Sequence, residues 1–464
     1  MRNYLLSLLV GLLTVTGSLS VAAQKAYAVL TPDDGTLTFY YDNQRDTRQN
    51  SRVIYDMPTS SWGTPAWAGN YNELQTKIKH AVFDTSFSRF RPTSTRSWFS
   101  YCISLQDIKG IRNLNTENVT DMTAMFSGCK ALKSLDLSNF NTQNVTSMNS
   151  MFEGCSALAS LDLSNFDTEK VTDMSRMFFN CKALTSLDLS NFNTENVTNM
   201  WEMFCDCKAL TSLDVSNFNT QNVTDMALMF SGCWSLTSID VSKFNTQNVG
   251  SMRRMFEDCQ ALTSLDVSKF NTQYVTDMSC MFQFCGALTS LDVSKFNTQY
   301  VTSMGYMFFG CKALTSLDLS NFNTQDVTDM SGMFSGCKAL TSLDLSKFNT
   351  QNVTDMNWMF YDCTSLTTIF CNNNWKVRYK IYDSFMFKNC TQLKGTNTSY
   401  NANKTGIEMA NPTTGYFTSK TTGIDHVKTT DRAGDGKIYD LSGRRVNESY
   451  KGIVIKNGKK YIQK

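Results

Sequence analysis

The sequence predicts an α/β repeat solenoid, a stack of short helices and one parallel β-sheet, flanked by small β-rich N- and C-terminal regions. Ten cysteines recur at a constant spacing of 26 residues, from Cys129 to Cys363. Each unit has nine apolar columns, the cysteine among them, and their spacing changes within every unit from a helical period to a strand period. Units of this size bury their apolar sides only against their neighbours, so a regular period of this kind indicates a stacked array.

The first half of each unit predicts a short helix. In the unit that begins at Val327, apolar residues follow at offsets of 3, 6, 7, 10 and 13, which trace one face of a helix running into a turn. The column of Asp329 contains only Asp, Ser or Asn in all ten units. These side chains accept hydrogen bonds from free N–H groups at a helix start, so we expect a helix N-cap at this column.

The second half of each unit predicts a strand. Leu343 and Leu345 alternate with the polar residues Ser342, Asp344 and Ser346, which is the pattern of a strand with one buried face. We expect these strands to join side by side into one parallel sheet, with the helical segments behind it.

The remaining segments follow from local patterns. The first residues combine Arg2, an apolar run at 4–16 and small residues at 21–23, which is typical of a secretory signal peptide, and no later run is apolar enough to span a membrane. Aromatic and β-branched runs predict strands at 35–43 and 77–87. The expected segments are a signal peptide at 1–23, a β-rich domain at 24–97, an N-terminal capping repeat at 98–117, ten repeats at 118–363, a degenerate repeat and cap at 364–420, and a β-rich C-terminal domain at 421–464.

The repeat resembles a known family. The pattern NVTDMSxMFxGCxxLTSLDLSxFNT, which extends from Asn118 to about Cys363, resembles the BspA-like (Treponema-type, DUF285) leucine-rich-repeat surface proteins. The resemblance implies a leucine-rich-repeat-like solenoid on an exported bacterial surface protein. It also implies a role in protein–protein interaction, since some members are adhesins for host matrix proteins or other bacteria.

The C-terminal segment resembles a second family. Residues 436–446 and 451–464 predict strands, with Asn457-Gly458 as a tight hairpin turn. They resemble the C-terminal sorting domain of Bacteroidetes cargo exported by the type IX secretion system. This resemblance implies a secreted protein at the cell surface, on the exterior of the outer membrane.

The cysteine column is compatible with buried thiols, pairwise disulfides or metal ligands. We expect buried free thiols, because we place the column at the end of the helical part, where stacked units should spread beyond disulfide distance. A metal needs four converging ligands, whereas the column supplies one thiol per unit and the chain has only two histidines. Oxidation of one pair remains open for the cysteines outside the column, which are Cys102, Cys205, Cys280, Cys371 and Cys390.

An acidic ladder is the candidate partner-binding site. One outward strand position holds Asp136, Asp162, Asp188, Asp214, Asp240, Asp266, Asp292, Asp318 and Asp344. Three of the lysines that follow three residues later belong to the same candidate site: Lys243, Lys269 and Lys295. Stacked carboxylates repel one another, so a ladder of this kind is either a recognition face, a row of weak cation sites, or a solvated face that keeps the sheet soluble.

No pattern predicts catalysis. The common hydrolase, metalloprotease and phosphate-binding motifs are absent from the sequence, and we expect no enzyme activity and no cofactor. The balance of 43 Lys and Arg against 41 Asp and Glu gives no electrostatic reason to expect nucleic-acid binding. We therefore expect a macromolecular protein partner. The alternative is a structural spacer or surface-layer component without a specific ligand.

Overall fold

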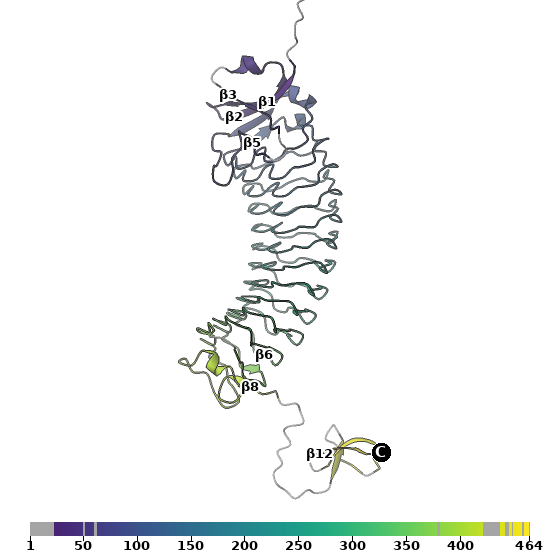
Figure 1. Cartoon of the computed structure of the whole chain (residues 1–464), viewed down its shortest axis with the longest axis vertical. Coiled ribbons are helices and arrows are strands. Elements are labelled where there is room, and N and C mark those ends of the chain that lie inside the picture. Colours follow the sequence, from purple (N-terminus) through teal and green to yellow (C-terminus); the bar gives the residue numbers. More distant parts are fainter. Residues whose placement is uncertain are drawn as a thin grey trace, which may run out of the picture.

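A computed structural model shows a sheet-containing N-terminal region that continues into a long stack of coils, each coil being one repeat (Figure 1). The structure describes residues 23–49, 52–59, 63–377, 381–420, 437–440, 445–447, 449–456 and 459–463. The signal peptide expected at 1–23 lies outside these residues, except for its last position. We number the repeats 1 to 10 by their column cysteines, from Cys129 to Cys363.

The N-terminal sheet has five strands in the order β3-β1-β2-β4-β5. Its elements are β1 (Lys25–Thr31), β2 (Thr36–Asp42), η1 (Arg45–Arg48), β3 (Val53–Asp56), β4 (His80–Phe83), η2 (Thr85–Arg89), β5 (Asp107–Lys109) and η3 (Ile111–Asn113). β1 is antiparallel to β2 and β3, whereas β4 is parallel to β2 and β5. β2 and β4 lie within the two runs that predicted strands. β5 comes from the expected capping repeat, so the sheet continues directly into the array.

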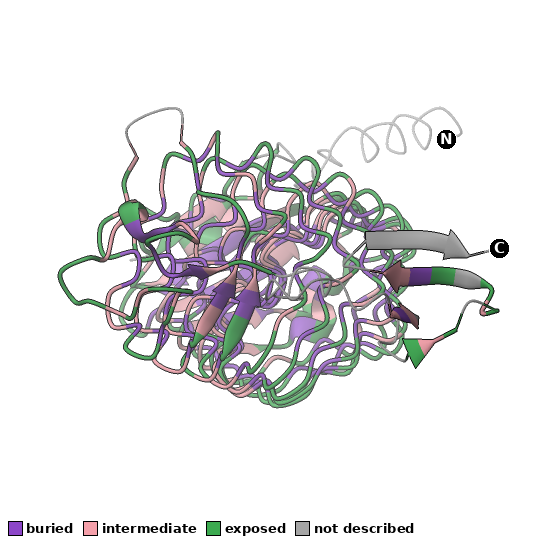
Figure 2. Ribbon diagram, turned by 90° about the horizontal axis from the view of Figure 1, so that it is seen from below, coloured by how far each residue is buried: buried purple, intermediate pink, exposed green. Residues whose placement is uncertain are grey.

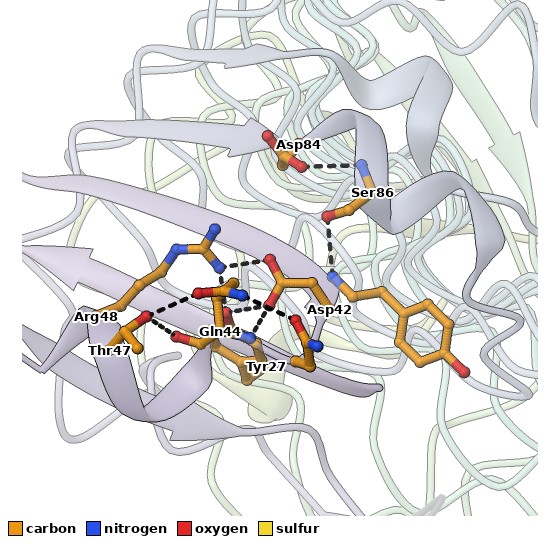
Figure 3. A network of polar contacts seen from close by, with 9 residues as sticks. Tyr27, Asp42, Gln44, Thr47, Arg48, Asp84 and Ser86 are labelled. Atoms are coloured by element: carbon orange, nitrogen blue, oxygen red, sulfur yellow. Dashed lines mark hydrogen bonds and ion pairs between the residues drawn. The ribbon is translucent and has the colours of Figure 1, made fainter. Parts of the chain in front are cut away.

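Aromatic packing and one polar network hold this end together. The ring of Phe39 stacks on Phe83 (4.6 Å between centroids) and on Trp98 (5.7 Å), which comes from the expected capping repeat. Figure 3 shows Arg48 of η1 donating to Asp42 (2.6 Å), which also accepts a hydrogen bond from the Tyr27 hydroxyl (2.6 Å). Burial and the contact with Asp42 raise the pKa of Tyr27, so this phenol stays protonated and bonded. The network fastens η1 to the β1–β2 hairpin.

The predicted helices are wrong: the structure describes no α-helix in any repeat. In repeat 1, the N–H of Ala124 donates to Asn149 O of the next repeat (2.8 Å), and the N–H of Met125 closes a turn on Met122 O (3.2 Å). Ala124 and Gly128 both have left-handed backbones, with φ of 54° and 73°. Left-handed residues interrupt a right-handed helix. Two consecutive turns produce nearly the same apolar spacing as a helix, and inter-repeat hydrogen bonds replace the bonds within a helix.

The predicted N-cap column has a different structural role. Because no helix follows, Asp329 caps nothing, but its carboxylate still accepts the N–H of Ser331 (2.8 Å) and closes a local turn. The same column forms single parallel bridges between successive repeats, which continue along the whole stack from Ser94 to Tyr382. The acceptor chemistry was therefore predicted correctly, and the element that it serves was not.

The single parallel sheet is also wrong. Strand pairing at the leucine columns occurs only at the C-terminal end, in the order β6-β7-β8, among β6 (Ser342–Asp344), β7 (Thr368–Phe370) and β8 (Phe417–Thr418). In earlier repeats the nearby inter-repeat bonds are long, such as Thr211 N–H to Thr185 O at 3.4 Å. The turns hold neighbouring repeats closer together, with bonds as short as 2.6 Å from Gly128 N–H to Glu153 O. The repeats therefore spread on the leucine side, which prevents a continuous sheet.

Columns of identical side chains form the core. Phenylalanine rings stack from repeat to repeat with centroids 5.2–6.0 Å apart and nearly parallel planes. The valine, methionine and cysteine columns beside them are buried, as the sequence pattern predicted, and so are the leucine columns apart from the partly buried Leu135 and Leu317. Figure 2 shows buried residues recurring along the whole stack. Buried threonines add hydroxyl bonds between repeats, such as Thr194 to Asn219 O at 2.9 Å. Every repeat is thus stabilised mainly by its two neighbours.

The last elements close the stack and form a separate sheet. Phe387 of the degenerate repeat stacks on Phe360 (5.2 Å), near the short η4 (Ile407–Met409). A four-stranded antiparallel sheet has the order β10-β9-β11-β12, from β9 (Ile438–Asp440), β10 (Arg445–Val446), β11 (Gly452–Lys456) and β12 (Lys459–Gln463). The predicted turn at 457–458 lies outside the described residues. Among the residues that the structure does describe, no helix is long and apolar enough to cross a membrane.

Candidate functional site

The cysteine column is part of the core. The Cys337 thiol donates to Phe308 O of the preceding repeat (3.1 Å), and the other column cysteines repeat this contact. Burial raises the pKa of Cys337 to about 12, so the thiol stays protonated and unreactive. Our reason for expecting free thiols was wrong, because the column lies on the closely bonded turn side. All 15 cysteines nevertheless are buried free thiols.

The acidic ladder lies on one outward face, on the leucine side of the stack. Asp344 is half-buried and the other eight aspartates are exposed. Each carboxylate accepts the N–H of the serine two residues later, at 2.9–3.1 Å. Hydrogen bonds from Ser242 hold the pKa of Asp240 below its ordinary value, and the same bonds act along the ladder. The face therefore presents a row of ionised carboxylates, each of which closes a local turn.

Cations pair with the ladder only at its two ends. Arg112 contacts Asp136 (3.1 Å) and Lys420 contacts Asp344. The structure shows no ion pair for the seven aspartates between them, nor for Lys243, Lys269 and Lys295, all of which it describes. Hydrogen bonds from Ser268 lower the pKa of Asp266, and the charge of Lys269 acts in the same direction. The ladder stays a prediction as a recognition face, and its local hydrogen bonds give the aspartates a structural role in addition.

A second surface lies on the turn side of each repeat. We define the turn face as the side chains at the columns of Ser331, Gly332, Ser335, Gly336 and Lys338. These five positions change from repeat to repeat, whereas the ladder face repeats nearly the same residues.

In repeats 2, 3, 4 and 6 the turn face carries ion pairs. Arg176 contacts Glu153 (3.0 Å) and Glu202 (3.2 Å), and Arg254 contacts Glu257 (3.5 Å). The pairs of Arg176 link repeats 2, 3 and 4, whereas the pair of Arg254 lies within repeat 6.

From repeat 7 onward the turn face becomes an aromatic groove of about 550 Å³. Its aromatic and lysine side chains are Phe284, Tyr306, Phe309, Lys312, Lys338, Trp358, Tyr361, Phe385 and Lys388. Phe284, Trp358 and Phe385 expose 37%, 40% and 47% of their surface, although large apolar residues are usually buried. None of these residues was a candidate site in the sequence analysis. The available signal was the gathering of aromatic residues at columns that hold Ala, Ser, Glu or Gly elsewhere.

Comparison with known proteins gives one family. Three overlapping segments match the family described as "Mycoplasma protein of unknown function, DUF285", at residues 93–213, 184–290 and 284–401. A leucine-rich repeat protein from Eubacterium ventriosum is similar in structure, with 14% identity over 68% of this chain and 93% of that chain and a TM-score of 0.27. The protein chain of a TLR13–ssRNA13 complex is 15% identical over 70% of this chain and 62% of that chain, with a TM-score of 0.20. No curated protein matches the sequence. Since the three matches together span well over half of its length, the chain belongs to the DUF285 family.

Proposed function

We propose that this protein is an exported bacterial surface protein that binds protein partners, acting as an adhesin for host matrix proteins or other bacteria. One observation carries the proposal: a nearly invariant stack presents a turn face whose side chains change from repeat to repeat. Repeats 2, 3, 4 and 6 offer ion pairs, and repeats 7 to 10 offer an aromatic groove. Selective binding needs such chemical variation at the centre of an interface, with aromatic residues as anchors.

The proposed location is the cell exterior. The signal-peptide pattern at 1–23 supports export, and the strand-rich segment at 421–464 resembles a type IX sorting domain. Deleting residues 421–464 should move the protein from the cell surface to the periplasm or the medium, as measured by fractionation and surface labelling. An unchanged surface fraction would contradict the role of this segment.

The binding function is tested by capture. The chain without its first 23 residues, immobilised through one terminus, is incubated with purified host matrix proteins and with whole bacteria of several species. We expect saturable capture of a small subset of these partners, lost when the chain is denatured. Equal, weak capture of every partner would contradict the proposal.

The alternative is a spacer or surface-layer component without a ligand. The near-identical LTSLDLS segments on the ladder face favour it, because a uniform surface gives little selectivity. The capture experiment decides between the two. We also propose that the protein is not an enzyme, and turnover in a screen of hydrolase and glycan substrates would contradict this.

A further inference from the structure

We propose that the aromatic groove of repeats 7 to 10 and the degenerate repeat binds an extended, acidic peptide segment of a protein partner, with apolar side chains placed between the acidic ones. The proposal rests on the proposed binding function and gives it a location and a partner chemistry. The ladder face has the opposite charge, so the two surfaces of the stack select different partners.

Small residues of repeat 9 form the middle of the groove. Gly332 and Ser335 occupy positions where both neighbouring repeats carry an aromatic side chain, and Gly336 follows Gly310 of repeat 8 in a column without side chains there. The Tyr306 ring lies directly on Gly332: a Cβ added there would come within 2.6 Å of two of its ring atoms. The gap between the aromatic residues of repeats 8 and 10 therefore depends on the lack of side chains in repeat 9.

One wall is a preorganised aromatic cluster. The Phe309 ring meets Phe284 at 5.0 Å and Tyr306 at 5.6 Å between centroids, both edge to face. Phe284 in turn lies on Gly310, where an added Cβ would come within 2.7 Å of its ring. Rings that are held in this way lose little conformational entropy on binding, which is what an anchor site needs.

The other wall retains exposed aromatic residues in strained positions. Trp358 and Phe385 have φ of 57° and 58°, in the left-handed region, where Gly332 stands in repeat 9. A residue with a side chain costs energy in this region, and an exposed indole or phenyl ring adds a solvation cost. The fold itself requires neither ring, because the neighbouring repeat uses glycine. The presence of two exposed rings that the fold does not require therefore indicates that they bind a partner.

The charge of the groove selects an acidic partner. Three lysines, Lys312, Lys338 and Lys388, line it together with a single acid, Asp362, which pairs with Lys338 at 3.0 Å. The Lys388 ammonium lies 4.4 Å from the Phe385 ring centroid, so charge and aromatic surface are presented together. Lysines around an aromatic floor attract carboxylates and leave apolar side chains to the rings.

The length of the groove fits a short strand of peptide. Four steps between stacked rings, of 5.2–5.9 Å each, separate repeat 7 from the degenerate repeat, so the groove is roughly 20 Å long. An extended chain rises about 3.3 Å per residue, so about six residues span the groove. Successive side chains of such a chain point in opposite directions, which allows apolar and acidic residues to alternate.

The test uses a library of displayed random peptides of about eight residues, selected on the full chain without its first 23 residues. The groove variant is Phe284→Gly with Trp358→Gly. Both substitutions introduce the glycine that an adjacent repeat already carries at the same column, Gly310 beside Phe284 and Gly332 beside Trp358, so the fold should be kept. The matched control is Asp206→Gly with Leu228→Gly, which changes the same two columns outside the groove.

We expect enrichment of peptides that combine Asp or Glu with aromatic or aliphatic residues. Their affinity should fall at least about tenfold on the groove variant and stay unchanged on the control variant, and should weaken with added salt. Enrichment of basic peptides, no enrichment, or equal binding to both variants would overturn the proposal. Binding of an acidic polysaccharide such as heparin to the groove without peptide binding would also overturn it. Selective partner capture that the groove variant retains would refute the groove and leave the binding function standing.

Discussion

Replacing Phe230 by Ala tests whether the stacked phenylalanine column carries the stability of the array. Phe230 lies in repeat 5, is 0% exposed, and stacks between Phe204 (5.7 Å) and Phe256 (5.6 Å). Removing a buried phenyl ring costs about 3–5 kcal/mol through lost burial and the cavity that remains. Each ring pair contributes about 0.5–1.5 kcal/mol of that amount, so we expect a loss near the upper end of the range.

The loss should weaken both neighbouring interfaces, because each repeat depends on the repeats beside it. The assay is urea unfolding followed by circular dichroism, together with hydrogen exchange that resolves single repeats. We expect a lower midpoint and faster exchange in repeats 4 to 6, with smaller effects at the ends of the array. Phe230→Leu, which refills most of the volume, should recover most of the stability.

The prediction has a clear refutation. A change of less than about 1 kcal/mol for Phe230→Ala would mean that the ring is not a packed core residue. A uniform rise of exchange across the whole chain would contradict the nearest-neighbour description of the stack.

Three further predictions follow from the same contacts. Almost no thiol of the native chain should react with a thiol reagent, because all are buried. After denaturation without reductant, about 15 thiols should react, and a count near five would show that the cysteine column forms disulfides. Trp358→Gly should stabilise the chain by up to about 1 kcal/mol, because glycine adopts the left-handed conformation of residue 358 without the steric cost of a side chain. A lower melting temperature of this variant would show that the tryptophan is not strained. Asp240→Ala should lower the melting temperature by removing the acceptor for Ser242, whereas Asp240→Asn should keep most of the stability at neutral pH. Since the folded pKa of Asp240 is lowered, its stabilisation is present above the unfolded pKa near 3.8 and is lost as the pH falls through the folded value. The Asn variant should therefore lose less stability in acid, and identical acid unfolding curves would contradict this.

The buried columns could be predicted from the sequence because the repeats serve as an alignment of one another. Val327, Met330, Phe334 and Cys337 are all fully buried, as their recurrence indicated. Recurrence reports which side chains face the core, and this prediction needs no knowledge of the backbone.

The backbone itself could not be predicted in the same way. Apolar offsets of three and four residues suit a helix and also suit two successive turns with left-handed residues. Gly336 was a visible sign of a left-handed position, but the same column holds Asp in repeat 10 and Phe in repeat 7, which obscured it. Hydrogen bonds between repeats decided the outcome, and a pattern within one repeat does not contain them.

The candidate site was predicted in part. The ladder face was placed correctly on the outside of the stack, because alternation with buried leucines determines it. The aromatic groove was missed because comparing repeats emphasises what they share, whereas Trp358 and Phe385 are informative through their differences. The groove also depends on the small residues of repeat 9. They leave a gap only because aromatic residues of repeats 8 and 10 lie on either side of them, and this arrangement is visible only in the structure.

The most direct test of the account is the affinity of one captured protein partner for three forms of the chain. These forms are the unchanged chain, the groove variant Phe284→Gly with Trp358→Gly, and a ladder variant with Asp240, Asp266 and Asp292 changed to Asn. The account predicts that the groove variant binds at least about tenfold more weakly, while the ladder variant keeps most of the affinity. Loss of binding in the ladder variant with full binding in the groove variant would contradict it and would place recognition on the acidic face.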